Sequence, residues 1–412
     1  MADFHQGGPI TTLHRIIDRN PEELAYEMTA FARQRRQTLI LPCLYSELET
    51  PAMTTILNGL KQATYIDQIV VGLDRADATQ YAYARNFFKD LPQHVRILWN
   101  DGPRLRGVHD RLAEYDLARY EPGKGRNVWY CLGYTLATGR SSVIGIHDCD
   151  IATYKPDLPA RLMYPIANPA FNFAFAKGYY ARVANGTLKG RVCRLFVTPL
   201  IRALKQVVGK TDFLNYLDCF RYSLSGEMAI RTDVAYGLRV ASDWGLEVSM
   251  LSEMYRNHTV HRLAQVDIAD IYDHKHREFD PAEKDDGLSR MASDIAKSLF
   301  RKLATQGTIF SHETFRTLKA TYYRTALDLI EQYRADAFFN GLKINRDEEE
   351  QCVEVLAEVI ISAGQHYLDN PLESPFIPSW QRVESAMGDI FEHISSAVED
   401  DLNDAGIGAS PS

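Results

Sequence analysis

In the first 180 residues, short continuous apolar runs alternate with longer segments of helical pattern. An apolar run rich in β-branched residues and bounded by turn signals is typical of a strand buried on both faces. Such runs predict strands at residues 38–41, 68–72, 95–99 and 143–146, the first of them stopped by a proline. Helical segments of this length between strands predict an α/β fold with a mostly parallel sheet covered by helices.

Capping signals fix where several helices begin and end. Asn20-Pro21 joins a cap residue to a proline at the first helical position, and Thr50-Pro51 repeats that signal. A third helical pattern, at residues 125–138, stops at Gly139. Residues 171–175 have strand character, and Asn345 resembles the cap of a later helix.

The pattern changes to helix alone from about residue 285, where apolar positions recur three or four residues apart. A chain of 412 residues is long enough for about two domains. We therefore expect a first domain over residues 1–280, a helical C-terminal region over 281–403 and a disordered tail over 404–412.

Composition narrows the class of protein. Hydrophobic residues make up 45% of the chain, which suits a large core, and the net charge of −8 argues against a nucleic-acid binder. No apolar run approaches the roughly 20 residues of a membrane span, and the N-terminus carries no secretory signal. The six cysteines show no metal-type pairing, so we expect reduced thiols in a cytoplasmic protein.

The most informative motif is Asp148-Cys149-Asp150, directly after the predicted strand at 143–146. Ligand sites of open α/β sheets lie where strands end, and a turn there lets both carboxylates approach one hard cation. Mg²⁺ and Mn²⁺ prefer such oxygen ligands and share them with substrate phosphates. A solvated pair of turn-capping aspartates is the structural alternative.

Other loops carry residues suited to a phosphorylated substrate. Lys124, between two glycines, precedes the helix that leads to the Asp148 strand, and its charge suits phosphate. The loop at 189–192 offers Arg191, whose fork grips phosphate or carboxylate. Acids also occur in the turns at 225–227 and 242–247, and a His-x-His lies at 274–276. Each of these segments, taken alone, also reads as an ordinary turn, helix start or basic loop.

Taken in order over residues 39–280, the motifs resemble the metal-dependent nucleotide-sugar glycosyltransferases with a GT-A fold. Within that class the chain is similar to the retaining glucosyl-3-phosphoglycerate synthases, with mannosylglycerate synthases as near relatives. No single motif is specific, whereas the ordered set is. The matching segments are residues 41–47, 122–125, 148–150, 190–192, 224–227, 243–247 and 273–276.

The resemblance implies roles for individual residues. Asp150 and His274 would bind Mg²⁺ or Mn²⁺, and Glu247, beside the transferred sugar, would share the catalytic role with Asp150. The residues implied to bind the nucleotide sugar are Pro42, Leu44, Glu47, Asp74, Lys124, Asp148 and Cys149, and those implied to bind the acceptor are Gly190, Arg191, Val192 and His276.

The resemblance implies transfer of glucose from UDP-glucose to 3-phosphoglycerate, with retention, for compatible-solute synthesis by a homodimer. A related synthase that uses GDP-mannose or another donor with glycerate or phosphoglycerate is the alternative. Three departures from the family pattern, Cys193, Tyr272 and His276, affect the acceptor side more than the donor side.

Two functions of other classes compete with this interpretation. Aspartyl-nucleophile phosphatases also place Asp-x-Asp after an apolar strand, and their first aspartate attacks phosphorus. They usually require Thr or Val two residues after the second aspartate, where this chain has Ala152. A nucleotide-sugar sensor without turnover is the other competing function.

Overall fold

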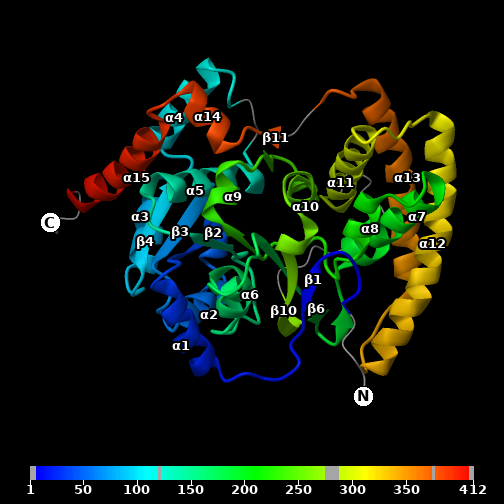
Figure 1. Ribbon diagram of the computed structural model, residues 1–412, viewed down its shortest axis with the longest axis horizontal. Coiled ribbons are helices and arrows are strands. Elements are labelled where there is room, and N and C mark those ends of the chain that lie inside the picture. Colours follow the sequence, from blue (N-terminus) through cyan, green and yellow to red (C-terminus); the bar gives the residue numbers. More distant parts are fainter. Residues whose placement is uncertain (1–5, 119–121, 274–286, 374–375, 408–412) are drawn as a thin grey trace.

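The computed structural model describes residues 6–118, 122–273, 287–373 and 376–407. Its centre is a mixed, nine-stranded sheet in the order β1-β10-β6-β8-β5-β2-β3-β4, with β7 paired to β6 (Figure 1). The strands are β1 (Thr11–Leu13), β2 (Gln37–Leu44), β3 (Gln68–Asp74), β4 (His94–Trp99), β5 (Val143–Ile146), β6 (Phe175–Ala184), β7 (Thr187–Leu188), β8 (Met228–Arg231) and β10 (Leu263–Tyr272).

Strand direction confirms the expected mostly parallel sheet. β2 runs parallel to β3 and β5, β3 runs parallel to β4, and β10 runs parallel to β1 and β6. β8 is the exception in the middle of the sheet, antiparallel to both β5 and β6. The carboxyl ends of β2, β3 and β5 therefore meet at one edge.

Strand β2, predicted at residues 38–41, is longer than the sequence indicates. It continues through Pro42 to Leu44, instead of stopping at the proline. Its neighbour β5 ends at Ile146, opposite Ile40, so β2 lacks a β5 partner beyond that point. Proline is tolerated there because an edge position does not require its missing N–H.

Helices cover both faces of this sheet. On one face α5 packs against alternate strand residues such as Ile40 and Val70, and on the other α1, α2, α3 and α6 pack against residues such as Leu39 and Ile69. The expected caps are present, because Asn20 accepts from Glu22 N and Thr50 accepts from Met53 N. These helices are α1 (Pro21–Ala32), α2 (Pro51–Leu60), α3 (Ala78–Phe88), α4 (Pro103–Glu114), α5 (Lys124–Thr138) and α6 (Leu158–Ala167).

The second half adds helices on two sides of the sheet (Figure 1). The helices α11, α12 and α13 pack with α7 on one side, whereas α15 packs against α4, α5 and β4 on the other. A two-stranded sheet joins β9 (Val240–Ala241) to β11 (Phe376–Ile377). The helices are α7 (Thr198–Val207), α8 (Asp212–Asp218), α9 (Thr232–Tyr236), α10 (Leu246–Asn257), α11 (Gly287–Ala304), α12 (His312–Phe339), α13 (Arg346–Asp369), α14 (Trp380–Ala386) and α15 (Ile390–Ile407).

The strand expected at residues 171–175 is wrong in position. Asn168 closes a turn by accepting from Ala170 N, and β6 begins only at Phe175. Among the described helices, none is long and apolar enough to cross a lipid bilayer.

Candidate active site

The Asp-x-Asp motif lies at the predicted sheet edge, directly beyond the end of β5. His147 N donates to Ile40 O at 3.1 Å, which holds the motif beside β2. Cys149, between the two aspartates in sequence, is buried. The neighbouring thiol of Cys43 on β2, together with burial, raises the pKa of Cys149, so we interpret it as a packing residue that fixes the motif against β2.

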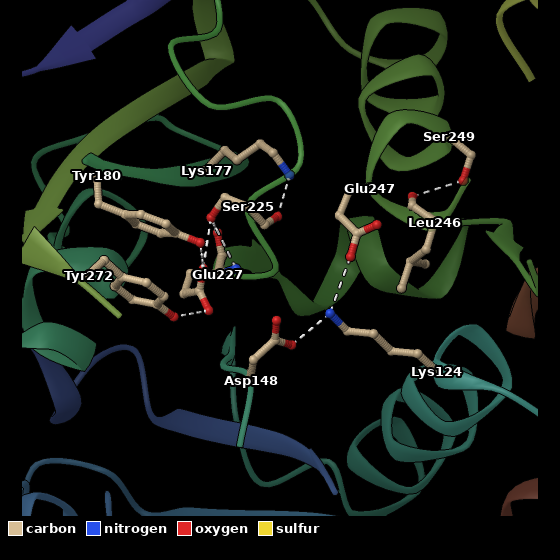
Figure 2. Close-up of polar contacts among 10 residues, drawn as sticks. All are labelled: Lys124, Asp148, Lys177, Tyr180, Ser225, Glu227, Leu246, Glu247, Ser249 and Tyr272. Atoms are coloured by element: carbon tan, nitrogen blue, oxygen red, sulfur yellow. Dashed lines mark hydrogen bonds and ion pairs between the residues drawn. The ribbon is translucent and has the colours of Figure 1, made fainter. Parts of the chain in front are cut away.

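Lys124 connects the motif to a second acid (Figure 2). Its Nζ lies 2.6 Å from Asp148 Oδ1 and 3.2 Å from Glu247 Oε1. Burial opposes the charge on Lys124, but the two carboxylates outweigh that effect and raise its pKa. The cluster therefore keeps one cation between two anions at the edge of the sheet.

Two neighbouring turns make this cluster possible. Lys124 is the first residue of α5. The next residue, Gly125, packs so closely against β9 that a Cβ at this position would lie 1.9 Å from Ala241 O. Six residues beyond Ala241, Glu247 occupies the first turn of α10. Asp243 stabilises the intervening turn by accepting from Gly245 N at 2.9 Å.

A buried polar network lies beside the cluster, to its left in Figure 2. The carboxylate of Glu227 accepts from Tyr180 Oη at 2.7 Å, from Ser225 Oγ at 2.9 Å and from the hydroxyl of Tyr272. Lys177 Nζ donates to Ser225 O at 2.7 Å. Tyr272, one of the departures from the family pattern, thus points into this network.

The residues implied to hold the uridine surround the ends of β2 and β3. Leu44 and Asp74 are register partners at those ends, with Pro42 two residues earlier and Glu47 buried in the following 3₁₀ turn. Asp74 accepts from Asn100 Nδ2 at 2.8 Å, and burial raises its pKa. No pattern in the sequence singles out Asn100, which lies just beyond the end of β4 and is recognisable only once strand order is known.

The loop implied to bind the acceptor leads into a π-helical turn, Val192–Val197. Gly190 has a φ of +79°, a conformation that favours glycine. Arg191 Nη2 lies 2.7 Å from Glu348 Oε2 on α13. Arg182 of β6 lies next to this loop, because its carbonyl accepts from Lys189 N at 2.8 Å.

Arg182 is a candidate site residue that no sequence motif indicated. Its guanidinium donates to Tyr222 Oη at 3.3 Å, and a Cβ on Gly190 would lie 3.6 Å from its Cδ. Burial opposes its charge, but Tyr222, Tyr180 and Asp150 together raise the pKa of Arg182. A second arginine thus lies beside the candidate acceptor loop, and its charge interacts with Asp150 of the Asp-x-Asp motif.

Of the two residues implied to bind the metal, His274 lies outside the described residues, and so does His276, which is implied to bind the acceptor. The chain reaches that segment beside the motif, because Asp273 O accepts from Ala152 N at 2.8 Å and Asp273 N donates to Thr153 Oγ1 at 3.0 Å. Within the described ranges no group of three or more His, Cys, Asp or Glu side chains is arranged to hold a metal. The carboxylates of Asp148 and Asp150 fit Mg²⁺ or Mn²⁺, which need hard oxygen donors.

Comparisons with known proteins show which family the chain belongs to. No family model matches the chain. It is 45% identical over 404 residues to the glucosyl-3-phosphoglycerate synthase of Persephonella marina, covering 98% of this chain and 100% of that protein. Its identity to the enzyme of the same name from Methanococcoides burtonii is 40% over 409 residues, covering 98% of each chain.

Solved structures support the fold. The chain resembles glucosyl-3-phosphoglycerate synthase from Mycobacterium tuberculosis in complex with Mn²⁺, uridine diphosphate and phosphoglyceric acid, with a TM-score of 0.51 and 20% identity. The match covers 71% of this chain and 86% of that one. The fold is therefore shared, and with the two full-length relatives the conclusion is direct: this chain belongs to the glucosyl-3-phosphoglycerate synthase family.

Proposed function

We propose that this protein transfers glucose from UDP-glucose to the C2 hydroxyl of 3-phosphoglycerate, with retention of the anomeric configuration. The observation that carries the proposal is the Lys124 cluster, which joins Asp148 and Glu247 at the edge where β2, β3 and β5 end. This cluster occurs in a chain 45% identical, along its whole length, to a glucosyl-3-phosphoglycerate synthase.

On the donor side, Leu44 and Asp74 would receive the uridine, together with Pro42 and Glu47. The buried carboxylate of Asp74, held by Asn100, offers hydrogen-bond acceptors of fixed direction to the base or ribose. Cys149 would contribute by packing. Loops after parallel strands are the usual place for a nucleotide, which supports this assignment.

Asp150 and His274 would hold Mg²⁺ or Mn²⁺, with Asp148 directed to the ribose or the same ion. When bound, the ion supplies Lewis-acid stabilisation of the charge that grows on the leaving diphosphate. Solved structures of the Mycobacterium tuberculosis enzyme contain Mn²⁺ or Mg²⁺ alongside uridine diphosphate. The position of Asp273 beside Ala152 supports delivery of His274 to the motif.

Glu247 would contact the transferred sugar, and Lys124 would hold this carboxylate in place. Fixed charges at a reacting centre cost no reorganisation during the reaction, so such positioning lowers the barrier. Glu247 is suited to orient sugar hydroxyls as a hydrogen-bond acceptor. The chain marks no nucleophile, so we favour attack from the same face, with the leaving diphosphate helping to take the acceptor proton.

The acceptor would lie at Gly190, Arg191 and Val192, with His276 nearby. Arg191 and Arg182 provide two guanidinium groups, which suit an acceptor that carries both a phosphate and a carboxylate. This pairing supports 3-phosphoglycerate over a neutral acceptor. The buried thiol of Cys193 lies 3.8 Å from Ser223 Oγ.

The test is a matrix of nucleotide sugars against 3-phosphoglycerate, glycerate and glycerol phosphate, with and without Mn²⁺, read by product mass. The proposal predicts glucosyl-3-phosphoglycerate from UDP-glucose only when metal is present. Product from GDP-mannose instead would favour the related mannosyl synthase. Phosphate release without any nucleotide sugar would favour an aspartyl-nucleophile phosphatase. Binding of a nucleotide sugar without turnover would favour a sensor.

We further propose that the protein is a homodimer and is located in the cytoplasm. Its chain would divide at residue 280 into a catalytic domain and a helical C-terminal region. The sequence and its resemblance support them. Light scattering on the purified full-length protein tests the assembly, since a mass near 46.8 kDa would contradict a dimer.

A further inference from the structure

A fully buried lysine, which the sequence did not indicate, lies next to the candidate site. Lys177, on β6, has no exposed surface and is among the largest fully buried side chains of the described residues. Lysine is almost never fully buried unless it is paired, because removing its charge from water is costly. Its place in the core therefore calls for a physical explanation.

The surroundings of Lys177 explain how it is tolerated. Its Nζ donates to the backbone carbonyl of Ser225 at 2.7 Å (Figure 2). Burial lowers its pKa to about 8, while Glu247 and Glu227 favour its charged form and Lys124 opposes it. Lys177 thus belongs electrostatically to the same group of charges as the Lys124 cluster.

The turn that Lys177 holds is in contact with Asp148. Gly226 follows Ser225, and a Cβ at this glycine would lie 2.3 Å from Asp148 Oδ2, so the backbone is packed directly against that carboxylate. On the other side of the turn, Glu227 accepts from Ser225 Oγ at 2.9 Å. The turn is therefore fixed from both sides and forms a wall for Asp148.

We propose that Lys177 is a positioning residue of the transfer reaction, acting through the Ser225 carbonyl to hold the Ser225-Gly226 turn against Asp148. In this way it sets the geometry in which Asp148 meets Lys124 and, through Lys124, Glu247. The inference rests on the proposed function, whereas the contacts that carry it are independent of the substrate. A role in stability alone does not account for Lys177, because an apolar residue of similar volume often replaces a buried charge at no loss of stability.

The test is Lys177→Met, which keeps the length of the side chain and removes both its charge and its hydrogen bond. We expect kcat to fall by about 10-fold to 100-fold, as for a small misplacement of reacting groups, with KM for UDP-glucose changed less than about 3-fold. We also expect an unchanged or raised melting temperature. Lys205→Met is the matched control, because it removes a lysine of α7 that is paired with Asp218 of α8, and it should leave kcat unchanged.

A second variant separates position from charge. Lys177→Gln keeps a hydrogen-bond donor for the Ser225 carbonyl without the charge, so it should recover part of the kcat lost in Lys177→Met. Equal kcat in the Gln and Met variants would overturn the positioning role. So would a wild-type kcat in the Met variant, or its failure to fold.

Hydrogen exchange keeps this test distinct from that of the proposed function. In Lys177→Met the peptide that contains Ser225, Gly226 and Glu227 should exchange its amides faster than in the wild type, with no substrate present. Unchanged exchange would overturn the inference even if the enzyme transfers glucose. Absence of glucosyl transfer by the wild type, with faster exchange in the variant, would instead count against the proposed function alone.

Discussion

At the scale of single residues, the main finding is that one cation joins two acids that are distant in the sequence. The sequence singled out Lys124, Asp148 and Glu247 separately, each in its own turn. Their contact could not be predicted, because Lys124 and Glu247 are 123 residues apart and meet only through the packing of α5 on β9. Lys177 gave no signal, since a lysine inside a strand usually faces solvent.

Replacing Lys124 with methionine tests this contact. The variant leaves Asp148 and Glu247 as neighbouring anions at the proposed diphosphate site, so we expect kcat/KM for UDP-glucose to fall by about 100-fold or more. Steady-state kinetics provide the measurement, with the exposed Lys210→Met as control. Activity within a few-fold of the wild type would contradict the role given to Lys124.

Asp243 makes a prediction about pH. Burial and the nearby Asp294 raise the pKa of this carboxyl from its ordinary value of 3.8 to about 6 in the folded protein. The folded protein therefore keeps this proton longer than the unfolded chain, and its contribution to stability is lost as pH rises from about 4 to about 6.

Asp243→Asn removes this loss while its amide oxygen still accepts from Gly245 N. The difference in melting temperature, variant minus wild type, should increase between pH 4 and pH 6 and stay constant above pH 6. The full increase corresponds to a free energy of unfolding of about 3 kcal/mol. Thermal unfolding over this range provides the test, with the exposed Asp110→Asn as control. A difference that does not change with pH would contradict the prediction.

At the scale of elements, the strands with short apolar runs were predictable, whereas several other strands were missed or misplaced. β3 and β5 read as continuous apolar runs, β4 reads as an apolar run interrupted at Arg96, and β5 matches its predicted range, Val143–Ile146. β10 was missed because charged residues such as Asp267 and Asp270 interrupt its apolar pattern. The order of β8 between β5 and β6 depends on long-range pairing, which local patterns do not encode.

The helical region also reaches the candidate acceptor loop. Arg194, in the π-helical turn, makes two hydrogen bonds to the carboxylate of Glu349 on α13, at 2.6 Å and 3.1 Å. Both side chains are buried. The cap at Asn345 predicted where α13 begins, but its anchoring to the loop required the structure.

Glu349→Ala should destabilise the protein by about 3 kcal/mol, because it leaves the Arg194 guanidinium buried without its carboxylate partner. Glu350→Ala is the control, since Glu350 pairs with Arg346 along the surface of the same helix and contributes under about 1 kcal/mol. Urea unfolding measures both. Equal small losses would show that the Arg194 pair is not an anchor.

At the scale of the whole molecule, the C-terminal residues return to the helix that carries Lys124. Trp380 of α14 stacks on Trp129 of α5 with ring centres 3.9 Å apart, and its Nε1 donates to Trp129 O at 2.9 Å. Nearby, β11 pairs with β9, the strand against which Gly125 packs. The C-terminal segment is thus coupled through the core to the helix next to the site.

Trp380→Ala should therefore lower the free energy of unfolding by about 3–5 kcal/mol, as for other large aromatic residues removed from a core. Phe339→Ala, at a side chain that is 89% exposed, should change it by less than about 0.5 kcal/mol. Denaturant titration of both variants gives the comparison. A loss below about 1 kcal/mol for Trp380→Ala would contradict a packed C-terminal segment.

The most direct test of the central claim follows the sugar itself. Full-length protein with Mn²⁺, 3-phosphoglycerate and UDP-glucose labelled with ¹³C at the anomeric carbon is monitored by NMR, beside the Asp150→Asn variant. We predict a new anomeric signal of unchanged configuration, with release of UDP, in the wild type, and at least about 100-fold slower transfer in the variant. No transfer, an inverted product or an equally active variant would contradict the account.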